Sequence, residues 1–188
     1  MKRAVDIFFS LIALLVLSPL LLVTAACIAF ESGRPVFFVQ QRCGFQGRPF
    51  GMLKFRSMVK NADGFGPYFT VAGDARITRT GQWIRRTSID ELPQIINVLR
   101  GDMSLVGPRP DVPAQRSLYT EEEWAERCSV RPGITGLAQV VNRSGGTDAE
   151  RLALDLQYVR GLQRGFGIVL DAKIMAMTFG RLTGKGAN

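Results

Sequence analysis

The sequence predicts an α+β fold that is mainly helical, and three observations support this. An uncharged run of 24 residues, from Ile7 to Phe30, is long enough as a helix to cross a hydrocarbon core of about 30 Å. Two strand-like stretches, "VFFVQQR" and "FGMLKFR", flank a Gly-rich turn and predict one small β-hairpin. From Thr147 onward, apolar residues recur at helical spacing. We therefore expect a membrane segment at residues 1–32 and one domain-sized body at residues 33–188.

The N-terminal segment admits three interpretations. Its length fits one transmembrane helix, and "TAAC", ending at Cys27, fits a cleaved signal, although the apolar run is longer than a usual signal core. Ser18-Pro19 near its middle favours a third form, because proline removes a helical hydrogen bond and bends the helix. Basic residues, which prefer the cytoplasm, flank the run on both sides: Lys2, Arg3, Arg34, Arg42 and Arg48. Both ends would then lie on one side of the membrane, as in a re-entrant helix hairpin.

Beyond residue 32 we expect short elements joined by loops. The β-hairpin lies near the membrane surface, and the turn-rich "VAGDARITRTG" follows it. Short helices are predicted at residues 82–86 and 89–99, then a polar helix around "AQRSLYTEEEWAERC". Gly/Pro-rich loops separate these helices from one another. The stretch "FGIVLDAKIMAMTFGRL" near the C-terminus predicts an apolar-faced helix, which fits a membrane interface and a protein core equally well.

Composition narrows the chemistry. The chain has 24 Lys and Arg against 16 Asp and Glu, and this net charge of +8 indicates an anionic partner: nucleic acid, a phosphate-bearing substrate or an acidic membrane. It has no histidine, which excludes Ser-His and Cys-His nucleophiles and His-ligated zinc. Its three cysteines are widely spaced and form no CxxC pair, so we expect reduced thiols in a cytoplasmic environment.

Two adjacent carboxylates, Asp90 and Glu91, stand out in "SIDELPQIINVL". Local structure explains them in part, because Ser88 and Glu91 match a helix capping box. If Asp90 is the cap instead, Pro93 falls within the first turn, where its missing N–H costs little. Both alternatives place the pair at a helix N-terminus, which favours anions.

The surroundings of this pair also suit phosphate chemistry. Arginines cluster near it in the sequence, and "VGPRP" supplies a rigid turn that can hold one of them toward a phosphate. Carboxylates and arginines without histidine fit phosphate chemistry assisted by a divalent cation such as Mg²⁺, with one carboxylate attacking phosphorus. The residues by themselves leave helix capping and catalysis both open.

Several long stretches, in one order, resemble the bacterial sugar transferases, also called monotopic phosphoglycosyl transferases: "KRAVDIFFSLIALLVLSPLLL", "FFVQQRCGFQGRPFGMLKFRSM", "TSIDELPQIINVLRGDMSLVGPRP", "RPGITGLAQV" and "LDAKI". The resemblance implies transfer of sugar-1-phosphate from a UDP-sugar to polyprenyl (undecaprenyl) phosphate. UMP would be released, and the polyprenyl-diphosphate sugar would prime glycan assembly. It further implies the minimal catalytic form of the family, on the cytoplasmic face of the bacterial inner membrane.

The resemblance also implies roles for individual residues. Asp90 would be the nucleophile that forms an aspartyl-phosphosugar intermediate, and Glu91 its partner, both beside Mg²⁺. Ser18 and Pro19 match the dipeptide that breaks the membrane helix and makes it re-enter. Further substrate or phosphate contacts would come from Lys54 in "KFRSM", Arg109 in "GPRP", Arg85, Arg131 and Asp171.

Two rival functions remain open at this point. One is an aspartyl-phosphate phosphatase or phosphotransferase without a lipid acceptor, and the other is a non-enzymatic basic scaffold on the membrane. We expect no nucleic-acid partner, because the basic residues are spread among Gly/Pro loops without aromatic interleaving. A homo-oligomer remains open. After "GLAQV" the sequence departs from the family pattern, which leaves the role of Asn142 and Arg143 unassigned.

Overall fold

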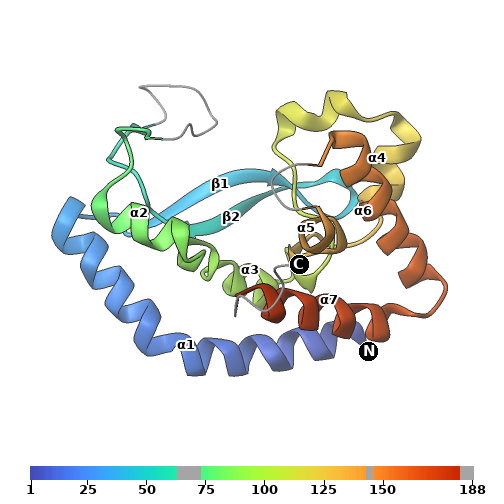
Figure 1. Ribbon diagram of the computed structural model, residues 1–188, viewed down its shortest axis with the longest axis horizontal. Helices are drawn as coiled ribbons and strands as arrows, with labels where there is room; N and C mark the ends of the chain where they lie inside the picture. Colours follow the sequence, from blue (N-terminus) through green and yellow to red (C-terminus); the bar gives the residue numbers. More distant parts are fainter. Residues whose placement is uncertain (63–72, 143–145, 183–188) are drawn as a thin grey trace.

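The structure is a computed structural model, and it describes residues 1–62, 73–142 and 146–182. It confirms an α+β fold that is mainly helical, with two small two-stranded sheets (Figure 1). Arg143 lies outside the described residues. The elements in chain order are α1 (Lys2–Ser32), β1 (Phe37–Cys43), η1 (Phe45–Gly47), β2 (Pro49–Phe55), α2 (Arg79–Arg86), η3 (Ile89–Glu91), α3 (Gln94–Arg100), β3 (Ser104–Val106), η4 (Pro113–Leu118), α4 (Glu121–Arg127), β4 (Gly133–Thr135), α5 (Leu137–Val141), α6 (Asp148–Gln163) and α7 (Gly167–Leu182).

Helix α1 is the one described helix that is long and apolar enough to cross a membrane. Pro19 lies inside it, and the Ser18 hydroxyl donates to the Leu15 carbonyl at 2.8 Å. Figure 1 shows α1 as a single bent helix along one side of the molecule. The structure therefore does not show the re-entrant helix hairpin that was predicted from the sequence. Helical structure continues past Pro19, because a proline removes one backbone bond while the neighbouring bonds keep the helix together.

The N-terminal end of α1 is bound to the rest of the molecule. Lys2 pairs with Asp171 of α7 at 2.5 Å. Asp6 is buried and accepts hydrogen bonds from the Ser104 hydroxyl and the Leu105 amide at the start of β3. Arg3 donates to two carbonyls at the end of α3, where a cation complements the helix dipole.

The C-terminal end of α1 is bound to the same body. Glu31 accepts hydrogen bonds from the Arg79 and Thr80 amides, which are unpaired donors at the start of α2. Arg56, directly after β2, donates to the last carbonyls of α1. Both ends of the apolar helix are thus held by polar contacts with one folded unit.

The predicted β-hairpin is confirmed. β1 and β2 pair antiparallel, with Phe38 opposite Lys54, and Phe37 stacked on Phe55. Met52 on β2 packs with Val98 of α3 in one of three hydrophobic clusters. Side chains two positions apart on a strand share a face, so the face that carries Met52 packs on this core and, at Lys54, also lines a cavity.

The remaining helices follow the prediction in type and differ in detail. The predicted helix at 89–99 is the 3₁₀ turn η3 followed by α3, and the predicted polar helix is η4 followed by α4. Helix α7 has a buried and an exposed apolar side, because Ile174 is fully buried in the core while Ile168, Val169 and Phe179 are exposed. Part of the apolar surface of α7 is therefore not covered by the rest of the described structure.

Candidate active site

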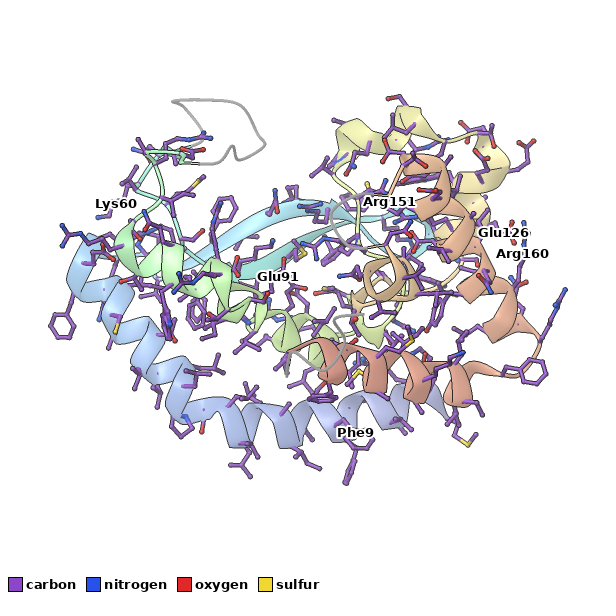
Figure 2. All side chains as sticks on the ribbon, in the orientation of Figure 1. Phe9, Lys60, Glu91, Glu126, Arg151 and Arg160 are labelled. Carbon is purple, nitrogen blue, oxygen red and sulfur yellow. The ribbon has the colours of Figure 1, made fainter. Side chains whose placement is uncertain are left out.

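A cavity of about 760 Å³ lies between the β-hairpin, residues 56–62, α2 and η3. Five of the sequence-predicted site residues line it: Lys54, Arg85, Asp90, Glu91 and Arg109. They come from β2, α2, η3 and the loop after β3, and Figure 2 labels Glu91 near the middle of the molecule. The cavity therefore gathers chemistry-bearing residues that lie as far apart in the sequence as positions 54 and 109.

The capping box, which the residues alone left open as an alternative to catalysis, is not formed around these carboxylates. Ser88 has a left-handed backbone with φ of 57° and makes no side-chain cap, and Asp90 lies within η3 instead of at a cap. Pro93 precedes α3 as its N-cap residue. The carboxylate of Glu91 is instead used in tertiary contacts. Charge-assisted bonds to two cations are stronger than a neutral hydrogen bond to a backbone amide, so they decide its orientation.

Glu91 is held by two cationic groups. Lys54 donates to its Oε1 at 3.0 Å, and Arg109 donates to both of its oxygens, at 2.6 and 3.2 Å. Burial opposes the negative charge, but Arg109 and Lys54 outweigh it and lower the pKa of Glu91 to about 2. Burial lowers the pKa of Lys54, with Glu91 opposing the shift. Glu91 is thus a fixed anion at neutral pH.

Asp90 is different. Among the described residues, no side chain donates a hydrogen bond to its carboxylate or forms an ion pair with it. Burial and the neighbouring Glu91 raise its pKa, while Lys54 and Arg85 act in the opposite direction. A carboxylate that lines a cavity without a bound partner keeps its lone pairs for a ligand, whether a metal ion or an electrophilic phosphorus.

Arg109 is positioned through its backbone. Its carbonyl accepts a hydrogen bond from Arg127 at 2.6 Å, and the next carbonyl, of Pro110, accepts one from Arg42 at 2.9 Å. Asp111 follows, fully buried and ion-paired with Arg127. Two prolines and these contacts fix the loop after β3, so the Arg109 side chain is aimed at Glu91 at little entropic cost.

The other predicted residues lie in two different settings. Arg85 lines the cavity and donates from Nε to the Ser57 hydroxyl at 2.7 Å. Arg131 and Asp171 do not line it. Arg131 is exposed, stacks over Phe45 and donates to the Gly101 carbonyl. Asp171 is occupied by Lys2 and by the Tyr158 hydroxyl, at 2.8 Å, where it joins α7 to α1 and α6.

Sequence reasoning missed several residues of the cavity. Gln40 and Arg42 lie two positions apart on β1, on the same face as Phe38, and all three line the cavity. The alternation of a strand, combined with the predicted position of Lys54 on the partner strand, would have indicated this face. Arg56 also lines it, and no simple sequence pattern marks a buried arginine at the end of a strand.

The carboxylates also fit one kind of metal site. Among the described residues no group of three or more His, Cys, Asp or Glu is placed to hold a metal ion. Mg²⁺ commonly uses only one or two protein carboxylates and takes its other ligands from substrate phosphates and water. Asp90 and Glu91 supply such a pair, so the cavity fits a Mg²⁺ that is held jointly with a phosphate-bearing substrate.

Fold and site together define a class of protein: a membrane-type helix fastened to a small α+β body, with paired carboxylates in a cationic cavity suited to phosphate groups. The comparison with known families agrees with this class. Residues 1–185 match the family described as "Bacterial sugar transferase", and the chain belongs to this family.

Individual relatives extend the comparison. The chain is 46% identical to the "Undecaprenyl-phosphate glucose phosphotransferase" of Komagataeibacter xylinus, over 96% of this chain and 35% of the relative. It is 44% identical to the "UDP-glucose:undecaprenyl-phosphate glucose-1-phosphate transferase" of Caulobacter vibrioides, over 90% of this chain and 67% of the relative. It is 43% identical to the "UDP-N-acetylgalactosamine-undecaprenyl-phosphate N-acetylgalactosaminephosphotransferase" of Aeromonas hydrophila, over 99% of this chain and 44% of the relative. The chain thus spans less than half the length of two of these three relatives.

Proposed function

We propose that this protein transfers sugar-1-phosphate from a UDP-sugar to undecaprenyl phosphate, releasing UMP and forming a polyprenyl-diphosphate sugar. The reaction would be a priming step of glycan assembly. The named activities of the relatives support this proposal, since both donor and acceptor appear in them. The observation that carries it is the contrast in the cavity, where no side chain of the described residues binds the Asp90 carboxylate while Glu91 is held by Lys54 and Arg109.

In the first step, a carboxylate oxygen of Asp90 attacks the phosphorus that bears the sugar. A new P–O bond to Asp90 forms. The bond from this phosphorus to the bridging oxygen of the diphosphate breaks, and UMP leaves with that oxygen. Lys54, Arg109 and Arg42 supply positive charge beside the diphosphate and stabilise the charge on the leaving UMP. Glu91 holds Lys54 and Arg109 in place for this role.

In the second step, a phosphate oxygen of the lipid acceptor attacks the same phosphorus. The bond to Asp90 breaks, its electron pair returns to the carboxylate, and the polyprenyl-diphosphate sugar leaves. The raised pKa of Asp90 suits its role in the first step, because a more basic carboxylate is a better nucleophile. Splitting the transfer in two lets one cavity serve two large anionic substrates in turn.

We include Mg²⁺ in this proposal, held by Asp90 and Glu91 together with the donor's diphosphate. When bound, it would neutralise part of the phosphate charge and polarise the reacting phosphorus. Glu91 keeps its negative charge at neutral pH, and carboxylate oxygens are suitable ligands for a hard cation. Lys54 and Arg109 stay bound to Glu91 and prevent it from turning away from the cavity.

The same proposal places α1 in the cytoplasmic face of the inner membrane without crossing it. A spanning helix would have its ends on opposite sides, whereas both ends of α1 are bound to one folded body. Figure 2 shows Phe9 pointing away from that body. Eleven large apolar side chains of α1 are exposed and would enter the lipid: Val5, Ile7, Phe8, Phe9, Leu11, Ile12, Leu15, Val16, Leu22, Val23 and Phe30.

Acceptor-dependent turnover tests the proposal. Purified protein in nanodiscs with Mg²⁺, a panel of UDP-sugars and undecaprenyl phosphate should release UMP over many turnovers only when both a suitable donor and the acceptor are present, and without the acceptor it should stop after a single turnover. An aspartyl-phosphate phosphatase would release product without the lipid, and a membrane scaffold would release none with any donor. Either of these results, from folded protein, would contradict the proposal.

A further inference from the structure

Arg56 is a second unusual arginine of the cavity. Its side chain is buried, with the residue 7% exposed. Its Nη2 makes three contacts at the C-terminal end of α1: the Ser32 carbonyl at 3.0 Å, the Ser32 hydroxyl at 2.7 Å and the Gly33 carbonyl at 2.6 Å. Its Nε and Nη1 are buried and have no hydrogen-bond partner in the described part of the chain. Nη2 of Arg56 therefore has a structural role at the end of α1, whereas Nε and Nη1 have none among the described residues.

Unpaired donors on a buried cation are costly. A buried hydrogen-bonding group without a partner costs about 1–3 kcal/mol, and more when the group is charged. Burial accordingly lowers the pKa of Arg56, and the described residues supply no carboxylate beside it. In native proteins such a group calls for a ligand, an ion or ordered water. Arg56 lines the cavity, so a bound anion would satisfy it.

Lys60 adds a second charge at this end of the cavity. It lines the cavity too, and its amine lies close to Gly33, 3.3 Å from the position a Cβ would take there. No ion pair to Lys60 is found among the described residues. Figure 2 shows Lys60 above the C-terminal end of α1 and well separated from Glu91. The cavity thus has two cationic ends. Glu91 pairs with Lys54 and Arg109 at one end, and Arg56 and Lys60 lie at the other.

The position of this second end indicates what it binds. Arg56 and Lys60 meet the last residues of α1, the helix with the largest exposed apolar surface. A phosphate that arrives on a long isoprenoid chain stays at the membrane surface while its chain remains in the lipid. A UDP-sugar arrives from water and needs no such contact. The end of the cavity beside α1 therefore fits a lipid-borne phosphate better than a soluble one.

We propose that Arg56 and Lys60 form a separate subsite for the phosphate of the isoprenoid acceptor, distinct from the donor site around Glu91. This inference rests on the proposed function and deepens it. Because Arg56 also caps α1, the subsite joins acceptor binding to the membrane helix. The acceptor phosphate would accept the hydrogen bonds from Arg56 Nε and Nη1 for which the described residues supply no acceptor.

A binding experiment tests this independently of turnover. Farnesyl phosphate, a short isoprenoid phosphate, is titrated calorimetrically into wild-type protein in phosphatidylcholine nanodiscs. Lys60→Ala is the primary variant because its side chain is exposed, and Arg56→Lys is the second. Arg34→Ala is the matched control, since it removes an exposed charge next to α1 that does not line the cavity. UDP-glucose binding is measured for each variant.

We expect Lys60→Ala and Arg56→Lys to weaken farnesyl phosphate binding about tenfold, as for loss of one charge-assisted contact. Arg34→Ala should leave it unchanged, and binding of UDP-glucose should be the same in all. An equal loss with Arg34→Ala would indicate general attraction to the membrane, and a loss confined to UDP-glucose would place the donor here. Either result overturns the subsite. If the variants show the expected losses of farnesyl phosphate binding but the wild-type protein has no turnover, only the proposed function is contradicted.

Discussion

Two clusters of arginines and carboxylates meet at the loop that carries Arg109, and they differ in how completely their charges are paired. The buried cluster consists of Asp111, Arg127 and Asp155, in which Arg127 contacts both carboxylates at 2.6 and 2.9 Å. Its members are sealed from solvent, with Arg127 4% exposed. The cavity cluster consists of Lys54, Asp90, Glu91 and Arg109, and within the described part of the chain Asp90 forms no ion pair.

The comparison shows how one set of residue types serves structure in one place and chemistry in another. In the buried cluster, the Tyr119 hydroxyl and Arg151 occupy the remaining acceptor sites of Asp111. A buried charge that is fully paired gives rigidity and has no capacity for a ligand. In the cavity cluster, by contrast, the carboxylate of Asp90 can still bind a ligand. Arg127 joins the two clusters, because it also donates to the Arg109 carbonyl.

The largest expected effect belongs to the unpaired carboxylate. Asp90→Asn should lower acceptor-dependent turnover by about 10³-fold or more, which corresponds to about 4 kcal/mol of transition-state stabilisation. Since folding raises the pKa of Asp90, the charged form costs stability above the pKa of the unfolded chain. The variant should therefore unfold at the same or a higher temperature at pH 7. Parallel turnover and thermal-unfolding assays check both parts, and a variant that is inactive because it is unfolded would refute the distinction.

Breaking the buried cluster should have its first effect on folding. Arg127→Leu leaves two buried carboxylates without their cation, and we expect a loss of about 3–5 kcal/mol in the free energy of unfolding. Arg160→Leu is the matched control, because Arg160 also joins α6 to α4, through Glu126, but on the surface. Denaturant unfolding should show a large shift for the first variant and little for the second. Similar shifts in both would contradict the comparison.

The pairing of Glu91 predicts a pH dependence of stability. Its pKa is about 2 in the folded protein, against 4.5 as the ordinary value, so its contribution is complete above the ordinary value. The contribution is lost as the pH falls toward 2, and about 2 kcal/mol should be lost by pH 3. Thermal unfolding from pH 7 to pH 3 should show a shallower decline for Glu91→Gln than for the wild type. Parallel pH profiles would show that Lys54 and Arg109 do not stabilise its charge.

The smallest effect is expected at Asp171. The resemblance to the family placed this residue among the substrate contacts, whereas in the structure it binds Lys2 and Tyr158 outside the cavity. Asp171→Asn should lower the free energy of unfolding by about 1 kcal/mol, the upper value for a partly exposed ion pair such as that with Lys2. The KM values for donor and acceptor should change less than twofold. A tenfold rise in either would return Asp171 to the site.

Much of the fold followed from local sequence patterns. The apolar run, the β-hairpin and the C-terminal helices were predictable because periodicity and Gly-rich turns report on neighbours in the chain. The capping box open at Ser88 is not formed because Glu91 binds Lys54 and Arg109 instead, and a local motif carries no information about such distant partners. Tertiary charge pairs therefore decided what local propensity left open.

The site was predictable in part for the same reason. Asp90, Glu91, Lys54, Arg85 and Arg109 meet in one cavity, as expected from motifs recognised in order along the chain. Arg42 and Arg56 were missed because their role depends on the face of a strand and on burial. Their burial is set by the way α1 and the loop after β3 pack onto the hairpin.

The most direct test of the account asks whether Asp90 becomes covalently modified. Intact-protein mass is measured after incubation with Mg²⁺ and each of several UDP-sugars, without lipid acceptor, while UMP is quantified. We predict an adduct with the mass of a sugar phosphate, formed in step with UMP, absent in Asp90→Asn, and discharged by undecaprenyl phosphate. Acceptor-dependent turnover without any adduct, or an adduct that persists in Asp90→Asn, would contradict the central claim that Asp90 is the nucleophile.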